Sequence, residues 1–182
     1  MILGNLLPDF QLGKHNAILY PCSSAFDQLV IEYCRMSLNS SNGILLILTQ
    51  YDSIENILKA LEDIDADITS RQKEGSFAIR ESRKAYFNLA DELVDIMIMV
   101  RMLLQRKRKL GKDCLTVICD MRVFFYKKRI IDLLLHETKL LSGSVDDDEA
   151  KIICCYEKSN LAFLSRQQKQ QILSIHHNVL EL

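Results

Sequence analysis

GKHNAILYPCSSAF, residues 13–26, is the stretch that decides the fold. Residues 16–20 are mostly apolar and predict a buried strand, after which Ser23 or Ser24 is suited to cap a helix. In nucleotide-binding α/β domains the turn between such a strand and helix carries a glycine-rich phosphate loop with a Lys-Ser/Thr pair. The turn Pro21–Ser24 has neither feature. The sequence therefore predicts the frame of a phosphate-binding fold without its phosphate chemistry.

The rest of the chain alternates strand-like and helix-like segments. Apolar runs predict further strands at 43–49, 75–80, 115–120, 150–156 and, at the end, 177–182. Amphipathic spacing predicts helices after Ser24 and Asp52, and over about 88–110, 123–141 and 165–175. Asn88 and Asp91 are expected to cap the third helix, with Leu89 in its apolar stripe. This order predicts an α/β protein, a three-layer α/β/α sandwich with a mainly parallel sheet.

Composition and charge place the chain among globular domains. With 182 residues, of which 48% are hydrophobic and 26% charged, we expect a lead-in at 1–14 and one domain at 15–182. The formal net charge of −1 provides no field toward nucleic acid or an anionic membrane. The basic run 106–109 is interpreted as a helix end, where cations offset the helix dipole and Gly111 stops the helix.

No targeting or membrane segment is expected. The first residues lack a basic start, a sustained apolar stretch and a small-residue cleavage site. Charged residues interrupt the apolar helices, so none is predicted to span a membrane. We therefore expect a cytoplasmic location.

The six cysteines lack the spacing of a metal site. No CxxC pair occurs, and the adjacent Cys154 and Cys155 would point to opposite faces of one strand. The acidic run 146–149 lacks the ligand spacing and glycine of a calcium loop. The expectation is reduced, structural thiols, with no metal and no cofactor.

Candidate ligand-binding residues come mainly from the ends of the predicted strands, where open α/β sheets bind ligands. They are His15, Tyr20, Cys22, Tyr51, Asp120, Arg122 and Tyr156. Tyr20 and Tyr156 would be neighbours if their strands pair, and would form either a polar pocket wall or a satisfied core pair. An internal hydrogen bond is favoured for His15, while His176 and His177 are expected at the surface or in a turn. No catalytic arrangement of Ser, Cys, His and carboxylate can be assigned from the spacing.

Several short motifs resemble one family. They are Gly13-Lys-His15, Ile18-Leu-Tyr20, the run 43–48, Cys154-Cys-Tyr156-Glu-Lys158, Ile172-Leu-Ser-Ile-His-His177 and Val179-Leu180. Together they resemble the methanogen and methylotroph sensory (MEDS) domain, a degenerate relative of RecA and KaiC type ATPases. The resemblance covers about 13–182 and is weakest over 82–112. Glu157 stands where the family usually has Asp.

The resemblance implies a fold and a role. It implies a RecA-like sheet in which the fifth strand lies between the first and the fourth, and it places Asp120 where active ATPases have a metal-assisting carboxylate. Family members are regarded as sensory, are often joined to histidine kinases or DNA-binding modules, and are proposed to bind small hydrocarbon derivatives.

Three functions follow as hypotheses. The first is a non-catalytic sensory domain that binds a small ligand and signals through self-association or a partner such as a kinase or transcription regulator. The second is a protein-interaction scaffold, for which the apolar helices could form a homo-oligomer interface. The third is a residual nucleotide binder, which rests on Asp120 and fold analogy alone.

Overall fold

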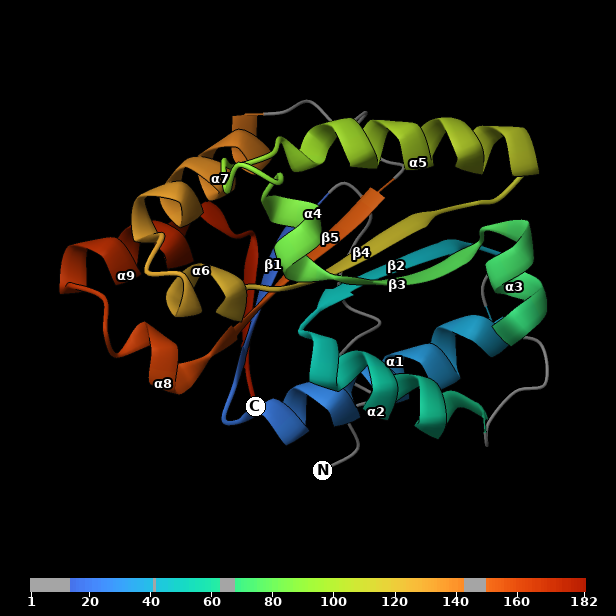
Figure 1. Ribbon diagram of the computed structural model, residues 1–182, viewed down its shortest axis with the longest axis horizontal. Coiled ribbons are helices and arrows are strands. Elements are labelled where there is room, and N and C mark those ends of the chain that lie inside the picture. Colours follow the sequence, from blue (N-terminus) through green and yellow to red (C-terminus); the bar gives the residue numbers. More distant parts are fainter. Residues whose placement is uncertain (1–13, 41, 63–67, 143–149) are drawn as a thin grey trace.

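The computed structural model describes residues 14–40, 42–62, 68–142 and 150–182. Within them, six strands form one all-parallel sheet in the order β3-β2-β4-β5-β1-β6 (Figure 1). The strands are β1 (His15–Tyr20), β2 (Ile44–Thr49), β3 (Phe77–Glu81), β4 (Leu115–Asp120), β5 (Ala150–Glu157) and β6 (Asn178–Glu181). Strand β5 lies between β1 and β4, so the expected strand order and the parallel α/β fold are both confirmed.

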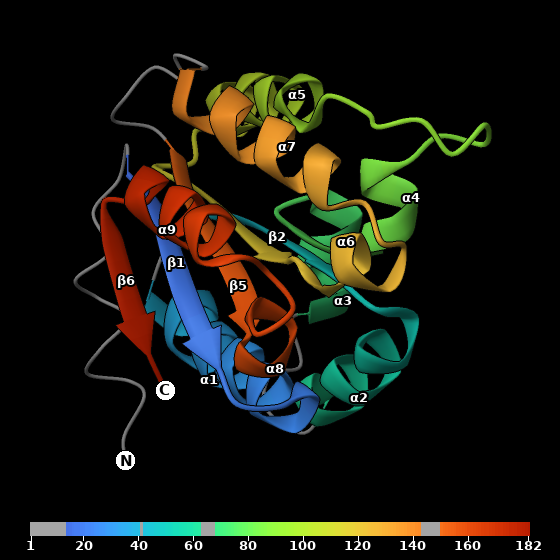
Figure 2. The ribbon, with the colours of Figure 1, turned by 90° about the vertical axis from the view of Figure 1, so that its left-hand side faces the viewer.

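Helices cover both faces of this sheet and complete the three layers (Figures 1 and 2). They are α1 (Ser23–Ser40), α2 (Tyr51–Glu62), α3 (Ile68–Glu74), α4 (Ser82–Tyr86), α5 (Ile96–Leu110), α6 (Arg122–Tyr126), α7 (Ile130–Ser142), α8 (Lys158–Leu161) and α9 (Arg166–Ile175). Helices α1 and α2 pack on one face, while α5, α7 and α9 pack on the other. Each face therefore has its own apolar core.

Side chains of the strands alternate between the two cores, as the period of two requires. In β5, Cys154 and Tyr156 face α5 and α7, whereas Ile153 and Cys155 face α1 and α2. The prediction that Cys154 and Cys155 point to opposite faces is confirmed. All six cysteines are free. Strands β2 and β4 are buried on both faces, which explains why they read as uninterrupted apolar runs, whereas the edge strands β3 and β6 are partly exposed.

The predicted start of the third helix was wrong. Residues 82–86 form the short helix α4, and α5 begins only at Ile96, where the carboxylate of Asp95 accepts a hydrogen bond from the N–H of Met97. Asn88 caps a loop instead, since its side-chain oxygen accepts from the N–H of Glu92. Leu89 is fully exposed. The capping pattern was real, but the Asn side chain stabilises a turn as readily as a helix start.

The single long helix expected over 123–141 is two helices, α6 and α7. Lys128 adopts the left-handed conformation with φ of 54°, and the N–H of Arg129 donates to the carbonyl of Phe124. Lys127 and Arg129 both pair with Asp91. The three consecutive basic residues 127–129 have no apolar side chain to bury in the core. The helix therefore ends before them, and the next helix, α7, begins at Ile130.

The end of α5 follows the sequence expectation. Gly111 has φ of 61° and the N–H of Lys112 donates to the carbonyl of Lys107, which closes the helix in a Schellman-type turn. Arg106 donates to the backbone carbonyl of Glu74. The basic run 106–109 lies in the last turns of α5, directly before Gly111, as the sequence predicts.

Two expectations lie wholly or largely outside the described residues. The lead-in at 1–14 does so apart from Lys14, and so does the acidic loop at 146–149. In the part of the chain that the structure describes, no helix is both long enough and apolar enough to cross a membrane.

Candidate functional site

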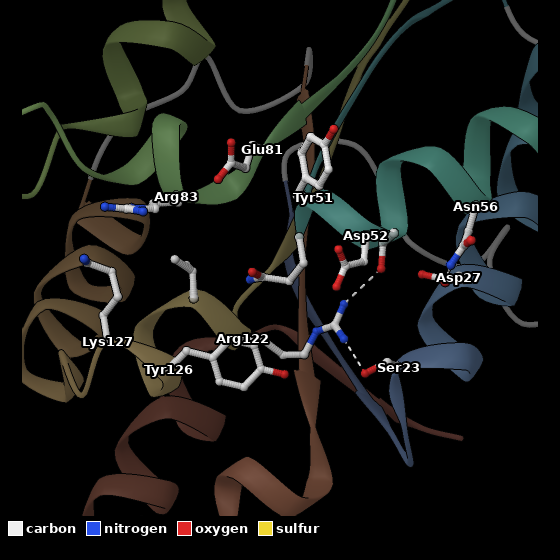
Figure 3. A pocket seen from close by; sticks show the side chains of 13 residues that line it. Ser23, Asp27, Tyr51, Asp52, Asn56, Glu81, Arg83, Arg122, Tyr126 and Lys127 are labelled. Atoms are coloured by element: carbon white, nitrogen blue, oxygen red, sulfur yellow. Dashed lines mark hydrogen bonds between the residues drawn. The ribbon is translucent and has the colours of Figure 1, made fainter.

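A pocket of about 380 Å³ opens where β2, β3 and β4 end and the helices that follow them begin (Figure 3). Its walls come from the first turns of α1, α2, α4 and α6. The lining residues are Ser23, Asp27, Gln50, Tyr51, Asp52, Ser53, Asn56, Glu81, Arg83, Arg122, Val123, Tyr126 and Lys127. This is the edge at which parallel α/β sheets bind their ligands.

Arg122 forms the inner wall of this pocket and is held from several sides. Its guanidinium donates to both carboxylate oxygens of Asp120, with Nε at 3.0 and 2.9 Å and Nη2 at 2.6 Å. Nη1 donates to the hydroxyl of Ser23 and Nη2 to that of Ser53, and these contacts bridge the first turns of α1 and α2 (Figure 3). Arg122 is 3% exposed and Asp120 is 0% exposed, so this ion pair is buried.

Asp120 accepts further hydrogen bonds from the strands beside it. The hydroxyls of Tyr20 and Thr49 each donate to it at 3.2 Å, and so does the N–H of Arg122 at 3.1 Å. Burial, and then the Asp120 charge, raise the pKa of Tyr20, so its phenol stays protonated and donating. We call Tyr20, Thr49, Asp120 and Arg122, with Ser23 and Ser53, the Asp120 network; it links β1, β2 and β4 to three helices.

The turn from β1 to α1 is short. Pro21 and Cys22 alone separate β1 from Ser23, the first residue of α1. The carbonyl of Cys22 accepts from the N–H groups of Ala25 and Phe26. The thiol of Cys22 is exposed, and its hydrogen bond with Ser24 lowers its pKa. In a phosphate loop this turn would surround an anion. Here it places the hydroxyl of Ser23, the first residue of α1, against Arg122.

A second polar cluster lies on the opposite face of the sheet, under α7 and α9. The Nε2 atom of His15 is 3.2 Å from the Sγ atom of Cys154 and 3.2 Å from Oε2 of Glu137. Nε2 of His176 is 3.4 Å from the same Oε2 atom. We call His15, Glu137, Cys154 and His176 the His15 cluster. These residue types can ligate a metal, and their four ligand atoms all lie within 4.8 Å of one another.

Burial holds the His15 cluster in its neutral forms. Desolvation lowers the pKa of His15 to about 2 and that of His176 to about 4. It raises the pKa of Glu137 to about 7 and that of the Cys154 thiol well above its ordinary value. The cluster therefore avoids the cost of isolated buried charges by changing protonation.

Comparisons with known proteins identify the family. The model of the MEDS family, described as methanogen/methylotroph, DcmR sensory domain, matches residues 14–177. The chain belongs to the MEDS family. A KaiC-like protein from the hyperthermophilic archaeon Pyrococcus horikoshii OT3 has a similar structure, with a TM-score of 0.57 at 13% identity over 95% of this chain and 73% of that chain. This likeness shows that the MEDS domain has a KaiC-like fold. A search of the curated proteins finds no match.

The candidate residues of this MEDS domain divide between the two clusters. Tyr20, Asp120 and Arg122 meet in the Asp120 network, and Tyr51 lines the pocket beside them. Cys22 lies in the turn nearby. His15 belongs to the cluster on the other face, where Tyr156 donates a hydrogen bond to Oε1 of Glu137. Of the seven residues, Tyr51 and Arg122 line the pocket, while the buried Tyr20 and Asp120 belong to the Asp120 network without lining it.

Two expectations about single residues were wrong. Tyr20 and Tyr156 do not share a pocket wall: the register pairs Tyr20 with Glu157 and Leu19 with Tyr156, so the two phenols point to opposite faces. His176 is buried rather than at the surface, whereas His177 is exposed as expected. The internal contacts expected of His15 are present.

Several residues of the two clusters were missed from the sequence of this MEDS domain. Glu137 is 0% exposed although its side chain is ionisable, and its signal was its position in the apolar stripe of α7, four residues after Leu133 and three before Leu140. Ser23, Ser53 and Thr49 had no such signal, because their partners are distant along the chain.

An apolar groove of about 600 Å³ runs beside the edge strand β3. It is formed by Ile54 of α2, by Ala78 and Ile79 of β3, by Ala85 of α4 and by α5. From α5 come Ile98, Met99, Met102 and Leu103. Ile98 and Met102 are more than half exposed, so the MEDS domain presents apolar surface there.

Proposed function

We propose that this MEDS domain is a non-catalytic sensor that binds a small ligand in the pocket at the strand ends. A ligand seated there would pass its signal to a partner, such as a kinase or a transcription regulator, or to a second copy. The observation that carries this proposal is the pocket itself, which meets the first turns of four helices beside the buried Arg122. The free thiols are in keeping with action in the cytoplasm.

The lining favours a small molecule with an apolar body and a polar group. Tyr51 and Tyr126 offer ring surface, while Arg83 and Lys127, the latter paired with Asp91, place cations at the pocket. A volume of about 380 Å³ is near the lower limit of small-molecule sites. A hydrocarbon derivative that carries a hydroxyl or carboxyl group fits both features.

Nucleotide hydrolysis is not proposed. Mg²⁺ in such enzymes needs carboxylate oxygens that are open to the ion and its phosphates. Both oxygens of Asp120 already accept hydrogen bonds from Arg122, Tyr20 and Thr49. We expect no hydrolysis of Mg-ATP, and hydrolysis that is lost in Asp120→Asn while the variant remains folded would contradict this.

Native mass spectrometry of the purified protein is the first test of ligand binding. We expect a small excess mass that is released on denaturation. Where none co-purifies, small alcohols and carboxylic acids are screened for a rise in melting temperature. Tyr126→Ala should weaken binding about tenfold or more, because it removes a wall of the pocket.

Phe163→Ala is the matched control for this test. Phe163 is 83% exposed and Tyr126 is 60% exposed, so neither truncation should disturb the core. Phe163 is not among the lining residues. Equal binding by both variants would place the ligand elsewhere.

The second candidate function is protein interaction through the groove beside β3. The observation that favours it is the exposure of Ile98 and Met102 next to a sheet edge. Met102→Glu should abolish self-association or partner binding, whereas Ile131→Glu on α7 should not. Two results together would exclude this function. The protein would be strictly monomeric, and the Met102→Glu variant would bind any partner as tightly as the parent protein does.

A further inference from the structure

We propose that His15, Glu137, Cys154 and His176 form a four-coordinate site for Zn²⁺ or a similar divalent transition metal. This site is separate from the ligand pocket, since none of its four residues lines that pocket. It is an assignment beyond the sensory role and does not depend on it.

The distances fit a tetrahedral ion with little adjustment. Bond lengths of about 2.0–2.1 Å to nitrogen or oxygen and about 2.3 Å to sulfur imply edges of roughly 3.3–3.8 Å between ligand atoms. The His15–Glu137, His15–Cys154 and His176–Glu137 distances are 3.2, 3.2 and 3.4 Å. No pair among the four ligand atoms exceeds 4.8 Å.

The outer contacts direct lone pairs toward the centre of the cluster. Nδ1 of His176 lies 2.8 Å from the carbonyl of Ile172, so this nitrogen carries the proton and Nε2 has the free lone pair. Tyr156 donates to Oε1 of Glu137 and leaves Oε2 for a metal. Such second contacts are the usual supports of metal-binding His and carboxylate groups.

Two of the four proposed ligand atoms make no hydrogen bond in the described part of the chain. Among the described residues, Oε2 of Glu137 and Nε2 of His176 make no hydrogen bond, although both are fully buried. Buried polar atoms are almost always satisfied, so such a pair calls for an explanation. A cation between them provides one, because it accepts electron pairs from both atoms at once.

The charges of the occupied site sum to zero. A divalent ion with one thiolate, one carboxylate and two neutral imidazoles carries no net charge. Binding releases the thiol proton of Cys154 and, where Glu137 is protonated, that proton as well. A neutral assembly is suited to a core position, where an uncompensated ion would be very costly.

The ligand set selects the class of metal and its role. Sulfur and imidazole ligands favour Zn²⁺ and its neighbours over Mg²⁺ and Ca²⁺, which take oxygen ligands. All four positions come from the protein, as in structural rather than catalytic zinc sites. The ligands lie in β1, β5, α7 and at the end of α9, so the ion would fasten the C-terminal helix to the sheet.

Cobalt substitution tests the site in the full-length protein. The protein carries Cys22→Ser to remove the exposed thiol, is treated with a chelator and kept reduced without thiols, and is titrated with Co²⁺. We expect one equivalent to give a thiolate-to-cobalt charge-transfer band and the strong visible bands of four-coordinate cobalt. Zn²⁺ should displace it and raise the melting temperature, and Mg²⁺ should do neither.

Matched variants locate the ligands. Cys154→Ser and His176→Gln should each weaken binding about 100-fold or more, since the loss of a ligand exceeds the 10–100-fold effect of an outer contact. The controls are Cys155→Ser, the next residue on the opposite face, and His177→Gln, the exposed neighbour. Both controls should bind within about threefold of the parent protein, an expectation that rests on their lying outside the site.

Two results would overturn the assignment. One is a parent protein without the thiolate-to-cobalt band at micromolar cobalt. The other is binding that survives Cys154→Ser and His176→Gln unchanged. Circular dichroism identifies a variant that fails to fold, and in that case the parent protein's spectrum and stoichiometry alone decide.

Discussion

The two polar clusters of this domain lie on opposite faces of one sheet, and they differ in how their ionisable groups respond to burial. In the Asp120 network, a carboxylate and a guanidinium keep their charges, and hydroxyls and a backbone N–H complete their hydrogen bonds. In the His15 cluster, neutral forms are favoured and two facing atoms lack hydrogen bonds among the described residues. The first cluster is complete without a ligand, whereas the second is not.

This difference indicates a supporting role for the Asp120 network and a binding role for the His15 cluster. A satisfied ionic network fixes the geometry of its neighbours, here the first turns of α1, α2 and α6 around the pocket. An unsatisfied buried cluster lowers stability until something fills it. On the two proposals made above, the Asp120 network shapes a site for another molecule, while the His15 cluster is itself the site.

The largest effect is expected from Asp120→Ala. This change leaves the guanidinium of Arg122 buried without its carboxylate, which typically costs about 3–5 kcal/mol. Urea unfolding followed by circular dichroism measures the loss. The double variant Asp120→Ala/Arg122→Met should recover much of it, since no charge then remains unpaired. A loss below about 1 kcal/mol in Asp120→Ala would mean that the pair is not buried in solution.

Acid should unfold the metal-free protein, and the sign follows from the pKa shifts. Burial lowers the pKa values of His15, His136 and His176 to about 2, 3 and 4 in the folded protein, against 6.5 in the unfolded chain. The unfolded chain therefore binds protons first, and the free energy of unfolding decreases as the pH falls below 6.5. Glu137 acts the other way, because its pKa of about 7 against 4.5 makes the folded state bind a proton as the pH falls.

Three histidines oppose one carboxyl group, so the net effect of acid is expected to be a lower free energy of unfolding. Near pH 5.5 the unfolded chain should bind roughly two more protons than the folded chain, a slope of about 2–3 kcal/mol per pH unit. Urea unfolding of chelator-treated protein between pH 5 and 7 measures it. A flat profile would show that the three histidines are accessible to water.

The fold could be predicted because it depends on local patterns. Uninterrupted apolar runs such as 43–49 mark strands buried on both faces, and their alternation with amphipathic helices leaves few topologies. The errors lie where local chemistry has two outcomes. Asn88 caps a turn instead of a helix, and the basic run 127–129 breaks a helix that the apolar spacing alone would continue.

The site could be predicted only in part, because a strand end fixes an edge but not a register. That rule brought Tyr20, Asp120 and Arg122 together correctly. It could not tell that Tyr156 pairs with Leu19 rather than Tyr20, which sends its phenol to the other face. Nor could it join Glu137 and His176 to His15, since those contacts span more than a hundred residues of chain.

The two buried tyrosines provide a direct comparison of the clusters. Tyr20→Phe removes one of several donors to Asp120, and Tyr156→Phe removes the donor to Oε1 of Glu137. Each should cost about 1 kcal/mol, the usual net value of a hydrogen bond. Tyr156→Phe alone should also weaken Co²⁺ binding, by about 10-fold, because it supports a ligand. Equal metal affinity in both variants would separate Tyr156 from the metal site.

The smallest effect is expected from Glu137→Gln in the metal-free protein, and it completes the contrast with Asp120. The amide oxygen of Gln can still accept from Tyr156, and its NH₂ group can donate to Nε2 of His176, an atom without a partner among the described residues. At pH 5 the native carboxyl is already protonated, so the substitution changes no charge. Stability should therefore shift by less than about 1 kcal/mol, within the range of a single neutral hydrogen bond. Addition of Zn²⁺ should stabilise the parent protein but not this variant. A large loss without metal would instead assign Glu137 a charged structural role like that of Asp120.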